Sequence, residues 1–397
     1  MVPEASDNNT RLRTAYLWPF SIEPWRNATP YQRVQCLSRR MDLCLFLPAG
    51  STVPRELLEN CSLTHVARSG RTICSMFEFA ANVGSAVRRL HKDRPFDLVY
   101  TSHFMEILAA MRLRQELKIP WVVDIFDDPG LSKALVRKGS RIRYWRHVLW
   151  EEAQKRLLRR ADLVVCGTGK HYLRACRIPR KKLLSVTNGV DLEITRPVAA
   201  RCSANGAGRI VCYVGFVSED RGAFTLAEAC AQAARSVGPV ELHFVGPCEE
   251  KTKAILLERW GGAPERLRID IPGRQPHERV LELIGASDAC VFPFPDAPEL
   301  AHIYPIKVYE YLAMGKAVVA SDLPGVRTII SDGANGLLFK PGDAASLRDK
   351  LVLLLSSPSL CDRLQKAARP SVERFDWQAI HDRIVAQLRS LVREGRR

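Results

Sequence analysis

The sequence alternates short apolar runs with longer segments of helical periodicity, and it does so twice along the chain. In the first half, the runs with the length and composition of buried strands are 14–18, 43–47, 98–101, 121–125 and 163–166. Segments with helical spacing of apolar residues occupy 30–40, 75–92, 103–117 and 140–160. Parallel strands need a crossover connection, which is usually a helix. The alternation therefore predicts a parallel sheet with helices on both faces.

The pattern restarts after residues 195–209, which are rich in Ala, Gly and Pro and which we interpret as a linker. Strands are expected at 210–214, 241–245, 267–269, 289–292, 317–320 and, at an edge, 337–339. Helices are expected at 223–236, 249–260, 278–286, 306–314, 346–356, 359–369 and 377–393. We therefore predict an α/β protein of two Rossmann-like, doubly wound domains, with ligands at the carboxyl ends of the strands and a cleft between the domains.

Targeting and redox signals favour a cytoplasmic protein. The first ten residues are polar and lack the apolar core of a signal peptide, and no apolar run approaches the roughly 20 residues of a membrane span. The twelve cysteines contain no C-x-x-C pair, so neither a zinc motif nor a disulfide scaffold is indicated. We expect the thiols to be reduced.

Positive charge is concentrated in the first half of the chain. Residues 1–200 contain 33 Lys and Arg against 19 Asp and Glu, which gives +14 of the total +16. Such a field suits an anionic lipid, an anionic saccharide or a nucleic acid, although excess arginine also simply solvates a surface. No basic-aromatic repeat, helix-turn-helix or zinc motif supports nucleic-acid binding.

A basic segment at 133–160 has ten lysines and arginines and an apolar stripe that includes Trp145 and Leu149. A helix of this kind can lie on an anionic membrane, or its stripe can pack on the sheet.

The segment 304–322 carries the most chemical information. It predicts a loop, a helix and a buried strand, with Lys307 and Glu310 three residues apart on one face of the helix start. The helix amides and the lysine suit phosphate oxygens, and the glutamate suits the vicinal hydroxyls of a ribose. An ordinary strand–helix unit with a solvated Lys–Glu pair gives the same pattern.

Four stretches fall in the order found in retaining glycosyltransferases of the GT-B fold, in their large fourth family (glycosyl transferases group 1). They are ADLVV at 161–165 with VTNGVD at 186–191, YVGFV at 213–217 with the Arg-Gly pair at 221–222, LHFVG at 242–246, and the block from 286–293 to 307–322. The match is a resemblance over roughly residues 161 to 340. It implies an acceptor domain at 1–190, a donor domain at 191–372, and a closing helix at 373–397 that crosses back to the first domain.

The resemblance implies a hexosyltransferase-type enzyme. It would move a sugar, with retention of configuration, from a UDP- or GDP-sugar to a saccharide or lipid-linked acceptor in cell-envelope or exopolysaccharide synthesis. No D-x-D motif occurs, so we expect no metal and no cofactor beyond the nucleotide-sugar co-substrate. The expected location is the cytoplasm, with possible peripheral contact at the anionic inner face of the membrane.

Residue by residue, the resemblance implies a catalytic role for two cations, Arg221 and Lys307, at the donor diphosphate. Gly215 and Gly246 would let backbone approach the donor, although a strand-end turn also explains Gly215. Glu310 would hold the ribose.

Further donor-site candidates lie in the loops. Arg274 follows a glycine on the base side of the pocket, and a solvated arginine is the alternative. The loop and first turn before Lys307 add Tyr304, Pro305 and Ile306.

Two positions depart from the family pattern. Phe216 stands where the family has an arginine, and His302 stands where it has its first glutamate. A branch of the family instead carries P-x-K-x-x-E-Y, as Pro305, Lys307, Glu310 and Tyr311 do here. We include Phe216 and His302 among the donor-site candidates, although a surface position explains His302 equally well.

In the first domain, an acidic loop follows the strand 121–125. It falls where relatives place a polar residue near the reacting sugar, so Asp127 and Asp128 are candidates for orienting the acceptor hydroxyl. Helix capping before Pro129 is the alternative. His103 occupies a similar strand end.

Two other functions stay open at this point. The departures at Phe216 and His302 suit a catalytically weakened relative that acts as a binding scaffold. A sugar-nucleotide epimerase shares the fold, although the NGVD and P-x-K-x-x-E-Y blocks favour transfer.

Overall fold

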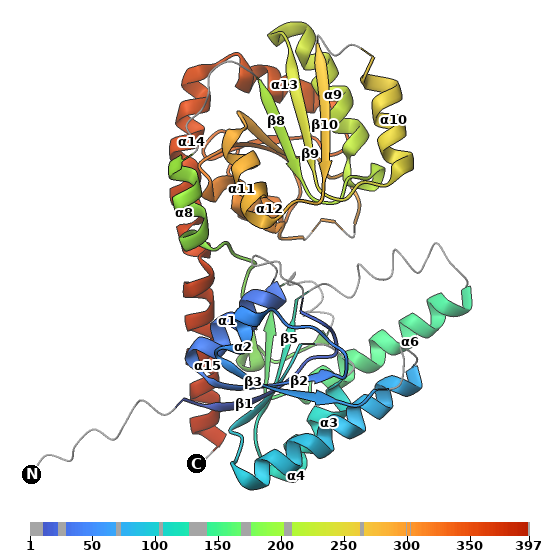
Figure 1. The fold of residues 1–397 in the computed structure, drawn as a ribbon, viewed down its shortest axis with the longest axis vertical. Coiled ribbons are helices and arrows are strands. Elements are labelled where there is room, and N and C mark those ends of the chain that lie inside the picture. The colour runs from blue at the N-terminus through green and yellow to red at the C-terminus, as the bar shows by residue number, and fades with distance from the viewer. Residues whose placement is uncertain are drawn as a thin grey trace, which may run out of the picture. The chain divides into compact units, whose positions relative to one another are not determined.

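The computed structural model describes residues 11–22, 29–68, 73–102, 106–126, 141–167, 176–201, 209–262, 266–298, 300–301 and 303–395 (Figure 1). The chain divides into two compact units. Unit 1 combines Met1–Thr187 with Gln378–Arg397, and unit 2 is Asn188–Trp377. Each unit has its own parallel sheet.

Unit 1 contains a seven-stranded sheet in the order β3-β2-β1-β4-β5-β6-β7. Its strands are β1 (Arg13–Leu17), β2 (Asp42–Pro48), β3 (Cys61–Val66), β4 (Leu98–Thr101), β5 (Trp121–Ile125), β6 (Leu163–Cys166) and β7 (Leu183–Ser185). Its helices are α1 (Thr29–Arg40), α2 (Arg55–Leu58), α3 (Ile73–Asp93), α4 (Ile107–Leu117), α6 (Arg141–Leu158) and α15 (Trp377–Gly395). The strand order reverses between β1 and β4, which pair directly.

Unit 2 contains a six-stranded sheet in the order β10-β9-β8-β11-β12-β13. Its strands are β8 (Ile210–Val214), β9 (Val240–Val245), β10 (Leu267–Gly273), β11 (Ala289–Phe292), β12 (Ala317–Ser321) and β13 (Leu337–Phe339). Its helices are α8 (Leu192–Arg201), α9 (Ala223–Val237), α10 (Glu250–Trp260), α11 (His277–Ala286), α12 (Ile306–Ala313), α13 (Ala344–Leu355) and α14 (Pro358–Val372). Helices α9 and α13 pack together, and α8 packs on α11 and α12 (Figure 1).

The burial of the central strands explains why they are visible as apolar runs in the sequence. Every residue of β5, β11 and β12 is buried. Strands covered on both faces read as continuous apolar runs rather than alternating ones. The predicted two-unit α/β architecture is confirmed, and these buried central strands coincide with predicted apolar runs.

The structure also corrects the predicted elements. Strands β3 and β7 were absent from the sequence prediction, because both lie at sheet edges and carry partly exposed side chains. The predicted linker at 195–209 is wrong in its first part, since α8 continues to Arg201. Asp191 caps this helix by accepting hydrogen bonds from the backbone N–H of Glu193 (3.0 Å) and Ile194 (3.1 Å).

The NGVD turn connects three segments of unit 2. The Asn188 side-chain amide donates to the Tyr304 carbonyl at 2.8 Å, just before α12. The Val190 N–H donates to the Phe375 carbonyl (3.0 Å), and the Trp377 N–H donates to the Val190 carbonyl (3.1 Å). The turn therefore fixes both the loop before α12 and the last residues of unit 2, Phe375 to Trp377.

Helix α15 packs within unit 1. Arg40 on α1 pairs with Asp382 at 2.7 Å and donates to Gln378 at 2.9 Å. The apolar face of α15 is buried, including Ile384 and Leu388. Among the described helices, none is long and apolar enough to cross a membrane.

Candidate functional site

The candidate site lies at the carboxyl ends of the unit 2 strands. The strand order reverses between β8 and β11, which are neighbours in the sheet. Gly215 follows β8, Gly246 follows β9, Arg274 follows β10, and Pro293 follows β11. In open parallel sheets, ligands bind at such a switch point.

Lys307 lies over this switch point among aromatic rings. Its Nζ is 4.5 Å from the ring centroid of Tyr213, 5.1 Å from that of Phe294 and 5.8 Å from that of Phe292. It donates to the Tyr213 hydroxyl at 3.3 Å. Tyr213 belongs to β8 and Phe292 to β11, so α12 holds the amine directly above both central strands.

Burial lowers the pKa of Lys307 to about 7. The positive charge of Arg221 contributes to this lowering, and Glu310 opposes both effects. A cation held without a close counter-charge is poised to gain one from an anionic ligand.

Glu310 lies one turn along α12 and is only 6% exposed. Its Oε1 accepts a hydrogen bond from His277 Nε2 at 2.6 Å. His277 is the first residue of α11, in the same loop region as Arg274. Lys307 and Glu310 were predicted to lie close together on one helix. The structure adds a third polar group, His277 from the β10–α11 connection, beside Glu310.

The two strand-end glycines are required by close packing. Gly215 has φ +132° and Gly246 has φ +149°. A Cβ on Gly215 would overlap the Lys307 amine, and a Cβ on Gly246 would overlap the Gly215 carbonyl. Only glycine combines that backbone conformation with that space.

Arg221 and Phe216 form the outer side of the site. Arg221 ends a short 3₁₀ turn and is exposed, with its guanidinium 6.0 Å from the Phe216 ring and 5.6 Å from the Phe294 ring. The Phe216 ring is 38% exposed, and its carbonyl accepts from the Tyr213 hydroxyl at 2.9 Å. Phe216 thus has an aromatic ring at the position where the family has an arginine, and Arg221 lies beside that ring.

The remaining predicted residues divide into two groups. Arg274 is exposed on the β10–α11 loop, while Tyr304, Pro305 and Ile306 lead into α12. The residues that lie outside the described part of the chain are Asp127, Asp128, His103 and His302. Within the described part, no cluster of His, Cys, Asp and Glu has the arrangement of a metal site.

The sequence analysis did not predict His277 as a site residue, and it assigned Tyr311 no role of its own. The Tyr311 hydroxyl accepts from the Val214 N–H at 2.8 Å, so it ties α12 to the end of β8. The only sequence signal for His277 was its place after β10, three residues beyond Arg274.

Unit 1 holds a separate buried polar cluster. Asp124 on β5 pairs with Arg33 on α1 at 2.5 Å and accepts from the Tyr100 hydroxyl at 2.5 Å. Glu106 lies just before α4, and both of its carboxylate oxygens are buried without a hydrogen-bond partner among the described residues. Burial raises the pKa of Glu106 well above its usual range.

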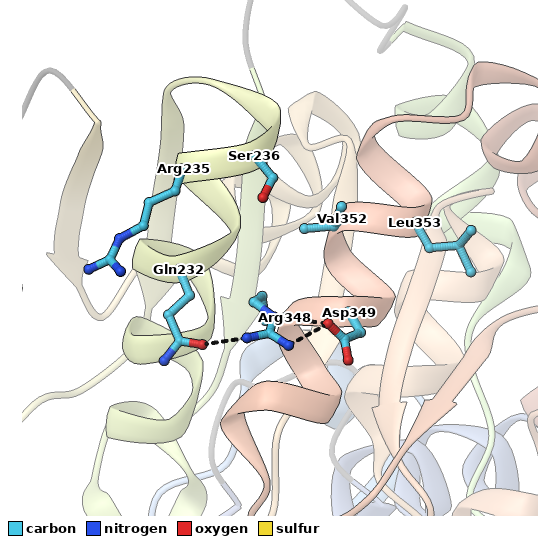
Figure 2. Close-up of a pocket in the computed structure, with 7 residues that line it drawn as sticks. All are labelled: Gln232, Arg235, Ser236, Arg348, Asp349, Val352 and Leu353. Carbon is cyan, nitrogen blue, oxygen red and sulfur yellow. Dashed lines mark hydrogen bonds and ion pairs between the residues drawn. The ribbon is translucent and has the colours of Figure 1, made fainter.

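A cavity of about 820 Å³ lies elsewhere, between α9 and α13. In Figure 2, Arg348 extends toward Gln232 and Asp349, to which it donates at 3.4 Å and 2.7 Å. None of the predicted site residues lines this cavity. Arg348 is already paired with Asp349, and none of the described residues that line the cavity is a lysine or a glutamate, so it does not share the Lys–Glu chemistry of the strand-end site.

Comparison with known proteins gives matches along most of the chain. Residues 31–189 match the family "Glycosyl transferase 4-like domain", and residues 201–371 match "Glycosyl transferases group 1". The phosphatidyl-myo-inositol mannosyltransferase of Mycobacterium leprae is 26% identical over 345 residues, which cover 83% of this chain and 85% of that protein.

Solved structures share the fold at low identity. Sucrose-phosphate synthase from Thermosynechococcus elongatus gives a TM-score of 0.73 at 19% identity, over 96% of this chain and 99% of that chain. Anabaena Alr3699/HepE, solved in complex with UDP, gives 0.72 at 18% identity, over 96% and 100%.

The two parallel-sheet α/β units match solved structures of the GT-B fold. With the family matches, the chain has a glycosyl transferase 4-like domain followed by a group 1 glycosyltransferase domain, and it is a glycosyltransferase enzyme. The resemblance predicted from the sequence is confirmed at this level.

Proposed function

We propose that the enzyme transfers a sugar from a UDP- or GDP-sugar to a saccharide or lipid-linked acceptor, with retention of configuration and without a metal ion. The observation that carries the proposal is the placement of Lys307 and Glu310 on one helix, over the β8–β11 switch point. Lys307 pairs with no carboxylate among the described residues, and a diphosphate would supply the missing negative charge.

The chemistry needs positive charge at the leaving group. When the bond between the sugar's anomeric carbon and the diphosphate breaks, its electron pair stays on the phosphate oxygen. Lys307 and Arg221 would stabilise that charge, and burial strengthens the effect of Lys307. Glu310 would accept hydrogen bonds from the ribose, while Asp127 or Asp128 would orient the acceptor hydroxyl.

Similar proteins support our inference of the donor and acceptor classes. Alr3699/HepE is a UDP complex, which supports a UDP-linked donor, and the Mycobacterium leprae relative is a mannosyltransferase named for an inositol lipid. We therefore favour a cell-envelope or exopolysaccharide product made at the cytoplasmic side of a membrane. Helix α6 supports peripheral contact with an anionic membrane, since Leu149 is 69% exposed and Arg156 and Arg159 are exposed nearby.

A nucleotide panel tests the proposal. Purified protein is heated with UDP, GDP and ADP, each with the wild type and with Glu310→Ala. A nucleotide at about 100 times its dissociation constant should raise the free energy of unfolding by about 2.7 kcal/mol. Glu310→Ala should lose most of that stabilisation, and Glu282→Ala, which removes an exposed carboxylate from α11, should keep it. Stabilisation by no nucleotide, or equal stabilisation in Glu310→Ala, contradicts the proposal.

A second candidate is a catalytically weakened glycosyltransferase that acts mainly as a nucleotide-binding scaffold. The observation that favours it is the aromatic ring of Phe216 at the position of the family's arginine. Nucleotide binding combined with no donor hydrolysis or transfer, over a panel of UDP- and GDP-sugars, would favour the scaffold. Turnover that Glu310→Ala abolishes would favour the enzyme.

A further inference from the structure

His277 contacts Glu310, the residue that would bind the ribose in the proposed function. Its Nε2 lies 2.6 Å from Glu310 Oε1, and the two side chains are 16% and 8% exposed. One residue begins α11 and the other lies on α12, 33 positions apart in sequence. The contact therefore joins the β10–α11 connection to the helix of Lys307.

A short hydrogen bond to a nearly buried carboxylate restricts that carboxylate strongly. The imidazole N–H occupies Oε1 and fixes the orientation of the carboxylate plane. The second oxygen, Oε2, then presents a defined acceptor direction. Two neighbouring ribose hydroxyls are donors with the right spacing for one oriented carboxylate, whereas a 2′-deoxyribose offers one donor fewer.

Placement near Lys307 adds an electrostatic argument. A diphosphate bound at the lysine brings negative charge close to Glu310, which is also negative, three residues further along α12. A hydrogen-bond donor on Glu310 reduces the repulsion between the two and holds the carboxylate in place when the ligand enters. Through His277, the β10–α11 connection would thus act on the sugar end of the nucleotide.

We propose that His277 is a positioning residue for Glu310, and that the pair sets the selectivity of the enzyme for ribonucleotides over 2′-deoxyribonucleotides. The inference rests on the proposed function, because that function gives Glu310 the ribose. Selectivity depends on carboxylate orientation, so losing the imidazole lowers the preference for the ribonucleotide more than it lowers general nucleotide affinity.

Paired nucleotides test the inference in the 397-residue chain. Dissociation constants are measured by calorimetry for UDP and 2′-deoxy-UDP, and for GDP and 2′-deoxy-GDP, with five proteins: wild type, Glu310→Ala, His277→Ala, His277→Gln and Glu278→Gln. The last is a matched control, because Glu278 is the exposed neighbour of His277 on the same helix turn. Gln at 277 keeps a side-chain N–H of similar reach.

The wild type should prefer the ribonucleotide by on the order of tenfold, the scale for one hydrogen bond to a charged group. His277→Ala should reduce that ratio several-fold while the affinity for the 2′-deoxynucleotide changes little. His277→Gln should restore part of the ratio, and Glu278→Gln should match the wild type.

The outcomes separate this inference from the proposed function. If Glu310→Ala abolishes the ratio and His277→Ala leaves it unchanged, the role of His277 is refuted and the proposed function stands. Equal loss of both affinities in His277→Ala also refutes the role, because a purely structural contact behaves in that way. If wild type binds neither nucleotide pair, or Glu310→Ala keeps the full ratio, the proposed function itself fails.

Discussion

The buried amine of Lys307 predicts that donor binding is coupled to proton uptake. Without ligand, burial and the nearby Arg221 hold the pKa of Lys307 at about 7. A diphosphate beside the amine favours its charged form and raises that pKa. Binding therefore requires a proton whenever the free enzyme carries the neutral amine, so affinity should fall as the pH rises through 7.

The magnitude follows from the lowered pKa. With a pKa of about 7, roughly nine-tenths of the amines are charged at about pH 6 and roughly one-tenth at about pH 8. The affinity for a nucleotide-sugar should then fall about tenfold between these two pH values, which is about 1.4 kcal/mol. Both phosphates of a nucleotide-sugar are esterified, so the ligand itself does not titrate in this range.

Titration calorimetry with UDP- and GDP-sugars at several pH values measures the slope. Repeating the titration in buffers of different ionisation enthalpy counts the protons that are taken up. Lys307→Met should bind more weakly at low pH and should lose the slope. Lys366→Met, which removes an exposed lysine from α14, should keep it. A flat affinity in the wild type, or the same slope in Lys307→Met, would show that Lys307 does not receive the diphosphate.

Three further predictions concern stability. Gly246→Ala should lower the free energy of unfolding, measured by urea titration, by about 1–3 kcal/mol or more, since Gly246 has φ +149° and no room for a Cβ. The control Gly262→Ala, at an open position, should change it by less than about 0.5 kcal/mol. Glu106→Gln should stabilise the protein, and the gain in unfolding free energy should grow from about pH 5 to pH 8. Because the pKa of Glu106 is raised in the folded protein, the unfolded chain loses this proton at a lower pH than the folded one, so the stability of the wild type falls as the pH rises. A gain that does not depend on pH would contradict this reasoning. Asp124→Ala should lower the unfolding free energy by about 3–5 kcal/mol, because it leaves the buried guanidinium of Arg33 without its partner; a loss below about 1 kcal/mol would show that the pair is not held as the structure has it.

The extent to which sequence predicts this fold depends on where each strand lies in its sheet. Central strands such as β5 and β12 are buried on both faces and appear as apolar runs. An edge strand such as β3 mixes polar and apolar residues, because one of its sides has no neighbouring strand. Helix α8 was mistaken for linker, since its alanines and Pro197 resemble connecting sequence when its cap at Asp191 is not considered.

The candidate site was predictable where its residues are close in sequence. Lys307 and Glu310 share a face because helical spacing places them there. The aromatic surroundings of Lys307 were not predictable, because Tyr213 and Phe292 read as ordinary strand residues until the order of β8 and β11 is known. The same holds for His277, whose contact with Glu310 depends on how the sheet brings two distant loops to one end.

The division of the chain has a consequence for how the protein is made. Unit 2 is one continuous stretch, Asn188–Trp377, inserted into a unit whose parts come from both sides of it in sequence. Unit 1 buries Ile384 and Leu388 of α15, so its core stays incomplete on the ribosome until that helix has emerged. The part of unit 1 that is translated first therefore completes its core only after unit 2 has been made, and until then the nascent chain exposes the apolar side chains that later bury α15.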